Sequence, residues 1–237
     1  MLRRVIAEAL GSAFLLAAVV GSGIMAERLS GGNVAIALLA NTLATGGVLF
    51  CLITALGPIS GAHFNPVVTL CDAWQNGLAW REVPPYLGAQ ILGALAGTAT
   101  ANAMFGLPAF FASHHARTGA PQWLGEFVAT FGLLTVIWGC VRFKNRSTAF
   151  AVAAYIVGAY WFTSSTSFAN PAVTIARSMS DTFAGIRPGD VAGFIVVQFL
   201  GAFAATALFA WLAPTSPSEA QAVLLAHETE EMRAVAI

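Results

Sequence analysis

Charged residues are scarce in this sequence: 9% of its 237 residues are charged, whereas 57% are hydrophobic. A soluble protein of this length needs far more charge to cover its surface, so the composition indicates an integral membrane protein. The 11 basic residues balance the 11 acidic ones, and the formal net charge is zero. The sequence lacks the excess of basic residues that is typical of a nucleic-acid-binding protein, so we expect no nucleic acid as a partner. From the composition, we expect the protein to lie in a lipid bilayer.

Residues that carry enzymatic or metal chemistry are also few. The three cysteines, Cys51, Cys71 and Cys140, lie in or beside apolar segments, and an odd number of scattered thiols provides no disulfide or metal framework. His114 and His115 are adjacent and have no third ligand nearby, which favours a solvated loop. The sequence contains no nucleotide-binding motif and no nucleophile elbow. We therefore expect packing cysteines, no metal, no cofactor and no enzymatic activity.

Long apolar segments are abundant, and six of them are predicted to span the membrane. These are Val5–Met25, Val34–Leu56, Tyr86–Met104, Trp123–Val141, Thr148–Phe162 and Val191–Leu212. The first is too long for a signal peptide and lacks a clear cleavage site. Gly57-Pro58 is expected to end the second. A polar, acidic tail follows over residues 214–237.

Two Asn-Pro dipeptides, Asn65-Pro66 and Asn170-Pro171, predict the starts of two short helices. Asn is a strong N-cap, and Pro fits the first helical position because its missing amide proton would be unpaired there. The predicted helices, Asn65–Trp74 and Asn170–Ser180, are too short to span; ten residues rise only about 15 Å. The irregular backbone before each is tolerated in a membrane only where protein buries it or it lines a watery cavity. An Asn whose oxygen caps its own helix keeps its NH2 group as a donor, so a pore is the leading interpretation.

An internal repeat relates the two halves of the chain, about 1–106 and about 122–213. Ala7–Ser12 matches Gly125–Thr130, and Gln90–Ala96 matches Gln198–Ala204. Each half contains three spans, an odd number, so the halves have opposite topology and their short helices enter from opposite faces and meet near the midplane. We expect one channel domain over residues 1–213, followed by the tail.

The basic residues predict the orientation. With the N-terminus inside, seven Lys and Arg residues fall on the cytoplasmic side and four, Arg28, Arg117, Arg177 and Arg187, on the outer side. The positive-inside rule then favours both termini in the cytoplasm. We expect a multi-pass protein of the inner (plasma) membrane.

The segments Ser60–Val67 and Phe168–Ala172 closely resemble the twin Asn-Pro-Ala boxes of the aquaporin/aquaglyceroporin (major intrinsic protein) family. The resemblance covers about residues 3–213. It implies an all-α integral membrane fold with six transmembrane helices, two re-entrant half-helices and an inverted repeat, assembled as a homotetramer. The boxes correspond to Asn65, Pro66, Val67, Asn170, Pro171 and Ala172, and Val67 departs from the usual Ala.

Glu8 and Glu126 occupy matching places in the repeat, inside predicted spans where a carboxylate is costly. In the resembled family such acids accept hydrogen bonds from the re-entrant loops, so we interpret both as structural buried acids. His63, two residues before Asn65, matches a family position that supports its loop and borders the inner pore.

The family's selectivity filter is carried over by offsets from the two Asn residues, counted without gaps. The four positions are Thr45, Gly158, Ser167 and Val173. Val173 replaces an Arg that nearly the whole family has. Because that Arg narrows the filter and adds donors and charge, its absence predicts a wide ring that passes solutes larger than water.

Arg177 leaves two interpretations open. It lies almost two helical turns beyond Asn170, on the same face, where it could line the outer vestibule and restore positive charge. Alternatively, it pairs with loop groups and anchors the short helix.

Two helix N-termini that meet inside a pore make its centre positive, which repels cations and interrupts a proton wire. We expect small uncharged solutes to pass: water, glycerol-like polyols and hydroxides.

Asn-Pro-Val together with the absent filter Arg resembles bacterial aquaglyceroporins associated with arsenic resistance, which implies trivalent arsenic as a further solute. Cys71 would bind arsenic if its thiol faced the path. The alternatives are a water-selective channel, or a secondary transporter built from inverted repeats.

Overall fold

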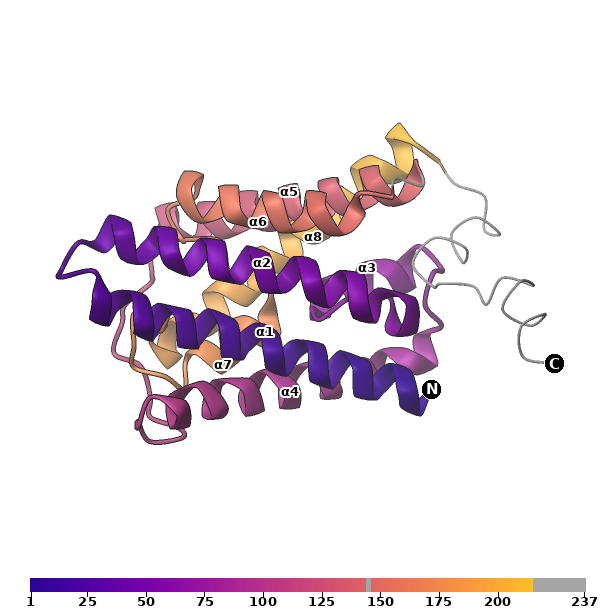
Figure 1. Ribbon diagram of the computed structural model, residues 1–237. Coiled ribbons are helices and arrows are strands. Elements are labelled where there is room, and N and C mark those ends of the chain that lie inside the picture. The colour runs from indigo at the N-terminus through magenta and orange to yellow at the C-terminus, as the bar shows by residue number, and fades with distance from the viewer. Residues whose placement is uncertain (144–145, 215–237) are drawn as a thin grey trace.

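The computed structural model describes residues 1–143 and 146–214, and within these ranges the chain forms only helices and loops. The predicted tail lies outside the described residues, apart from residue 214. Figure 1 shows the helices packed side by side as a bundle. The helices are α1 (Leu2–Leu29), α2 (Val34–Ser60), α3 (Pro66–Trp74), α4 (Val83–Met104), α5 (Ala120–Arg142), α6 (Thr148–Phe162), α7 (Pro171–Arg177) and α8 (Val191–Leu212), with 3-10 turns at Trp80–Glu82 and Pro188–Asp190.

Each predicted span corresponds to a helix, although several helices extend beyond the predicted limits. Among the described residues, four helical segments are long and apolar enough to cross a membrane. They are Leu2–Leu29, Val34–Ser60, Ala120–Arg142 and Pro188–Leu212. Helix α6 is apolar but has only 15 residues. The chain is therefore that of a multi-pass membrane protein.

Helix α2 does not end at Gly57-Pro58, contrary to the prediction. It continues to Ser60 with Pro58 inside its last turn. Proline removes one amide donor and crowds the carbonyl four residues back, yet the chain keeps its helical course for the two residues that follow. The residue that ends the helix is Gly61, which has a left-handed φ of 88°. Its amide donates a hydrogen bond to the Gly57 carbonyl, which completes a C-terminal cap.

Glycines let the long helices of each half approach closely. A Cβ on Gly97 of α4 would lie 2.0 Å from the carbonyl oxygen of Ala13 on α1. In the second half, a Cβ on Gly201 of α8 would lie 2.5 Å from the carbonyl oxygen of Phe127 on α5. Only glycine fits at such backbone contacts, which are typical of helices packed within a membrane.

The two short helices occupy opposite ends of the bundle. Helix α3 lies toward the end that holds the N-terminus, and α7 lies toward the other end, which we call the distal end (Figure 1). Helix α3 has the predicted limits, whereas α7 ends at Arg177 instead of Ser180. It stops early because the amides of residues 178–180 bond to carbonyls three residues back, which tightens the chain into turns.

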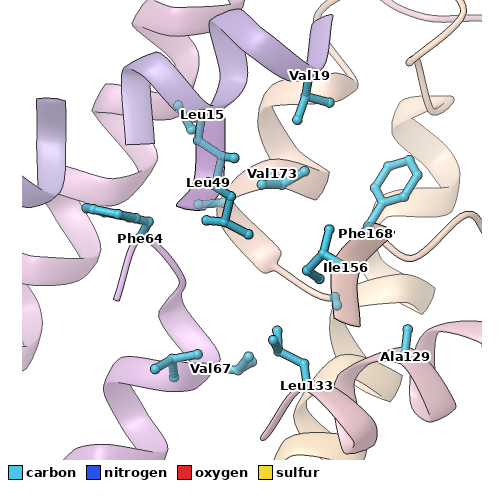
Figure 2. Close-up of a cluster of buried hydrophobic side chains, with 14 of the residues drawn as sticks. Leu15, Val19, Leu49, Phe64, Val67, Ala129, Leu133, Ile156, Phe168 and Val173 are labelled. Atoms are coloured by element: carbon cyan, nitrogen blue, oxygen red, sulfur yellow. The ribbon is translucent and has the colours of Figure 1, made fainter. Parts of the chain in front are cut away.

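A cluster of buried apolar side chains surrounds the region between the starts of α3 and α7. Figure 2 shows part of this cluster, contributed by α1, α2, α5, α6 and the two re-entrant segments. Val67, the residue that departs from the usual Asn-Pro-Ala box, is fully buried in it. The core of the protein thus lies around the two Asn-Pro motifs and fixes their position.

Candidate functional site

Both Asn-Pro motifs cap their helices as the sequence predicts. The Oδ1 atom of Asn65 accepts a hydrogen bond from the Val67 amide at 3.1 Å. The Oδ1 atom of Asn170 accepts from the amides of Ala172 and Val173 at 3.0 and 3.3 Å. Each Pro follows its Asn at the first helical position. The positive end of each short helix dipole therefore lies at its Asn-Pro motif.

The NH2 groups of the two Asn residues are not entirely free, which the sequence did not predict. The Nδ2 atom of Asn65 donates to the carbonyl of Ala169 at 2.8 Å. The Nδ2 atom of Asn170 donates to the carbonyl of Phe64, also at 2.8 Å. An amide NH2 carries two protons, so each Asn retains one N–H after this crossed pair of bonds.

Glu8 of α1 holds the first re-entrant loop. One carboxylate oxygen accepts from the Ser60 hydroxyl and the His63 amide, at 2.7 and 3.0 Å. The other accepts from the Phe64 amide and from Nε2 of Gln90, both at 2.7 Å. Glu8 is fully buried. Four donors thus replace the water that this buried carboxylate has lost.

Glu126 of α5 repeats this arrangement in the second half. It accepts from the amides of Phe168 and Ala169 at 2.8 and 2.9 Å, and from Nε2 of Gln198 at 2.6 Å. Gln198 also donates to Thr174 at 2.9 Å, just as Gln90 donates to Thr69 in the first half. In each half, the repeated Glu therefore binds the repeated Gln and the loop before the short helix, and the Gln binds a Thr on that helix.

Residues next to both Asn residues adopt left-handed backbone conformations. Phe64 has φ 47° and Ala169 has φ 48°, values that residues with a side chain rarely adopt. Their amides donate to Glu8 and Glu126, and their carbonyls accept from Asn170 and Asn65. The amide and the carbonyl of both residues are therefore hydrogen-bonded. These bonds stabilise a backbone conformation that is otherwise unfavourable.

A central cavity of about 100 Å³ lies at the meeting point of the two short helices. One part of its wall is polar, and another part is made of aliphatic side chains. The polar residues include Thr45, His63, Asn65, Tyr160, Ser167, Asn170 and Arg177. The aliphatic residues are Leu15, Val19, Leu49, Ile53, Val68, Leu133, Ile137, Val152, Ile156 and Val173. Such a wall offers a few hydrogen-bonding groups within a largely hydrophobic surface.

Three of the four predicted filter residues, Thr45, Ser167 and Val173, line this cavity. The Ser167 hydroxyl is buried and has no partner within the protein. Val173 is 5% exposed and presents no charge.

The fourth filter assignment, Gly158, is not at the cavity. Gly158 is exposed, and a Cβ on it would meet no atom within 4 Å. Helix α6 lines the cavity with Val152, Ile156 and Tyr160, spaced four residues apart. Two residues correspond to about 200° of rotation, so Gly158 lies on the face of α6 opposite the residues that line the cavity. The Tyr160 hydroxyl lies 3.5 Å from the Thr45 hydroxyl.

Arg177 combines the two interpretations that the sequence left open. Its Nε atom donates to the Ala184 carbonyl, and its guanidinium carbon lies 3.4 Å from the centre of the Phe168 ring. These contacts anchor the end of α7. Arg177 also lines the central cavity, and its buried Nη1 atom has no partner within the protein.

A second cavity, of about 270 Å³, lies at the distal end and shares Arg177 with the central one. We call it the distal cavity. Its wall comprises Val34, Leu38, Asn41, His115, Arg117, Gln122, Ser164, Thr166, Arg177 and Phe183. Burial lowers the pKa of Arg117 to about 10. Burial, together with the charges of Arg117 and Arg177, also lowers the pKa of His115 below its ordinary value.

His63 borders the central cavity and is tied to α3. Its Nδ1 atom lies 3.0 Å from the Thr69 hydroxyl, and its Nε2 atom lies 3.6 Å from a carboxylate oxygen of Asp72. Asp72 is 2% exposed, and the sequence reasoning missed it. Its position, seven residues after Asn65 on one helix face, was the signal that could have found it.

The cysteines do not form a site. Cys71 is fully buried in the apolar cluster and does not line either cavity, whereas Cys51 is exposed on α2. Within residues 1–143 and 146–214, no group of three His, Cys, Asp or Glu residues could hold a metal ion.

Comparisons with known proteins agree with this geometry. The family model "Major intrinsic protein" matches residues 1–169. Aquaglyceroporin AqpS of Rhizobium meliloti (strain 1021) is 54% identical over 89% of this chain and 90% of its own length. Aquaporin NIP1-3 of Oryza sativa subsp. japonica is 36% identical over 66% of this chain and 54% of its own length. The X-ray structure of the aquaglyceroporin from Plasmodium falciparum has the same fold, with a TM-score of 0.66 and 22% identity, covering 88% of this chain and 95% of that one.

Proposed function

Because this chain belongs to the major intrinsic protein family, we propose that it is a passive channel for small uncharged solutes such as glycerol and water. The observation that carries the proposal is the central cavity, where Asn65 and Asn170 are among the few polar groups in a largely apolar wall. A polyol can hydrogen-bond to these groups while its carbon atoms contact the aliphatic side chains.

We further propose the arrangement of the chain in the bilayer. Helices α1, α2, α4, α5, α6 and α8 are the six spans, and α3 and α7 are half-helices of an inverted repeat. Residues 1–213 form the channel domain, with both termini and the tail 214–237 in the cytoplasm, in the inner membrane and as a homotetramer. The repeated contacts of Glu8 with Gln90 and of Glu126 with Gln198 support the repeat.

Exclusion of ions follows from the two helix N-termini. Their partial positive charges meet near the crossed Asn pair, and the described residues that line the central cavity include no Asp or Glu. A cation that entered would lose water and gain no negative partner. Hydronium is refused for the same reason.

The proposed filter consists of Thr45, Tyr160, Ser167 and Val173, with Tyr160 in the place first assigned to Gly158. Val173 supplies neither the charge nor the bulk of the family's usual Arg. We propose that this ring passes solutes larger than water, including neutral trivalent arsenic hydroxide, whose three hydroxyls resemble those of a polyol.

The experiment is stopped-flow light scattering on proteoliposomes under inward gradients of sucrose, glycerol or arsenous acid. Fast shrinkage in all three, followed by protein-dependent reswelling in glycerol and arsenous acid only, is expected. Flux without saturation and with a low activation energy separates a channel from a transporter. The Val173→Arg variant should keep water flux and suppress reswelling. Shrinkage without reswelling in the wild type would mean a water-selective channel and would refute the wide filter.

A further inference from the structure

The distal cavity carries two guanidinium groups and no carboxylate among its described lining residues. Arg117 and Arg177 belong to different parts of the chain, the 105–119 loop and the end of α7, yet both border this one space. Both stack on Phe168, with guanidinium carbons 5.1 and 3.4 Å from the ring centre. Two like charges on one ring lie close together, which is costly unless a negative group comes near.

One of these guanidinium groups has an unused donor. Arg177 is 2% exposed, and its Nη1 atom has no hydrogen-bond partner in the protein. A buried charged donor without a partner is expensive, because it has lost its water. Since Arg177 lines the distal cavity, a ligand there can reach this side chain.

Three carboxylates lie nearby, and each already accepts hydrogen bonds from other groups. Glu126, which attracts both arginines, accepts from the amides of Phe168 and Ala169 and from Nε2 of Gln198. Asp190 accepts from the Arg117 backbone amide and from Arg187, at 2.9 and 2.8 Å. Asp181 accepts from the backbone and ring of His114, both at 2.8 Å. Neither Asp lines the distal cavity.

The other polar groups of the wall are already engaged, which leaves the arginines as the groups that can hold an anion. The Ser164 hydroxyl donates to the Pro121 carbonyl, Nε2 of Gln122 donates to the Ser164 carbonyl, and the Thr166 hydroxyl accepts from Arg117. Guanidinium groups bind carboxylate and tetrahedral oxyanions best, because their paired N–H groups match two oxygens.

We propose that the distal cavity is a binding site for a small oxyanion, a carboxylate or a tetrahedral anion, held by Arg177 and Arg117. The binding does not depend on which solutes the channel passes. A consequence that rests on the proposed function is obstruction: Arg177 borders both cavities, so a bound oxyanion stands in the path of neutral solutes.

The test is isothermal titration calorimetry on the full-length protein in detergent, with inorganic phosphate, acetate or chloride at matched ionic strength. Saturable heat is expected with phosphate or acetate and not with chloride. A larger affinity for phosphate assigns tetrahedral anions, and a larger one for acetate assigns carboxylates.

Two pairs of variants make the test specific. Val34 lines the cavity in the first turn of α2, so Val34→Glu adds a negative charge to the site without removing any hydrogen bond. Ile36→Glu adds the same charge in the same turn outside the cavity wall. Arg177→Gln removes the proposed ligand group, whereas Arg28→Gln removes an exposed arginine that does not line the cavity.

We expect Val34→Glu and Arg177→Gln to bind about tenfold more weakly or worse, the loss that one charge-assisted contact produces, and the two controls to bind like the wild type. The acidic residue at Val34 suits a helix N-terminus, so this variant keeps the test valid even if Arg177→Gln does not fold. Equal heats in wild type and Val34→Glu, or no saturable heat with either oxyanion, would overturn the site. Phosphate that binds without slowing glycerol reswelling would overturn the obstruction alone.

Discussion

Asn65 and Asn170 each donate a hydrogen bond across the centre of the protein to the loop that precedes the other. The two Nδ2-to-carbonyl distances, to Ala169 and Phe64, are both 2.8 Å. Each Asn thus caps its own short helix with its oxygen and hydrogen-bonds to the opposite loop with its nitrogen. These bonds hold the starts of α3 and α7 together at the centre of the proposed path.

The first prediction concerns this crossed pair. Asn65→Asp keeps an oxygen to cap α3 but cannot donate to the Ala169 carbonyl, and the free energy of unfolding should fall by about 1–3 kcal/mol. The added negative charge should also admit sodium ions. Thermal unfolding in detergent and a sodium-flux assay in proteoliposomes measure the two effects. Asn33→Asp is the control, because Asn33 caps α2 at the surface with its oxygen alone. Unchanged stability and sodium flux in Asn65→Asp would contradict the role of the pair.

The second prediction concerns the buried carboxylates. Glu126→Gln places an NH2 group where the amides of Phe168 and Ala169 need an acceptor. We expect a loss of about 1–3 kcal/mol of stability, because at least one buried donor is left without a partner. Glu27→Gln, on the exposed end of α1, should change little. Comparison of the two unfolding midpoints measures the effect, and equal midpoints would argue against a structural role for Glu126.

The third prediction separates the two faces of α6. Ile156→Phe enlarges a side chain that lines the central cavity, and it should reduce glycerol flux severalfold. Gly158→Phe adds the same ring two residues later, where open space surrounds the position, and it should leave flux unchanged. Stopped-flow reswelling in glycerol measures both. The reverse outcome would restore Gly158 to the filter and remove Tyr160 from it.

The fourth prediction is a dependence on pH at the distal end. Hydrogen bonds from the backbone and ring of His114 lower the pKa of Asp181 below its ordinary value of 3.8. A carboxyl whose pKa is lower in the folded state contributes stability above its unfolded pKa and loses that contribution as the pH falls through the folded value. Between pH 5 and pH 3, as a rough window, the unfolding midpoint of the wild type should therefore fall more steeply than that of Asp181→Asn. Parallel pH profiles would show that the bonds to His114 do not persist in solution.

Local sequence was sufficient for much of the fold. The Asn-Pro pairs determine where α3 and α7 begin, because a cap and a proline act within one helical turn. The long apolar segments and the repeated Glu and Gln likewise predicted the helices and their order along the chain. Where local signals competed, the prediction was less accurate: Pro58 did not end α2, since Gly61 three residues later supplies the better cap.

The tertiary structure decided which side chains line the central cavity. The sequence indicated the donors of Asn65 and Asn170 but not the carbonyls of the opposite loops that share them, which lie more than 100 residues away. It assigned Gly158 to the filter, whereas Tyr160 and not Gly158 lines the central cavity, because a count along the chain does not fix the rotation of a helix. It also left Arg177 undecided, whereas the fold both stacks it on Phe168 and places it between two cavities. Caps and apolar length act over a few neighbouring residues and can be read from the sequence, but the direction in which a side chain points depends on how distant helices pack.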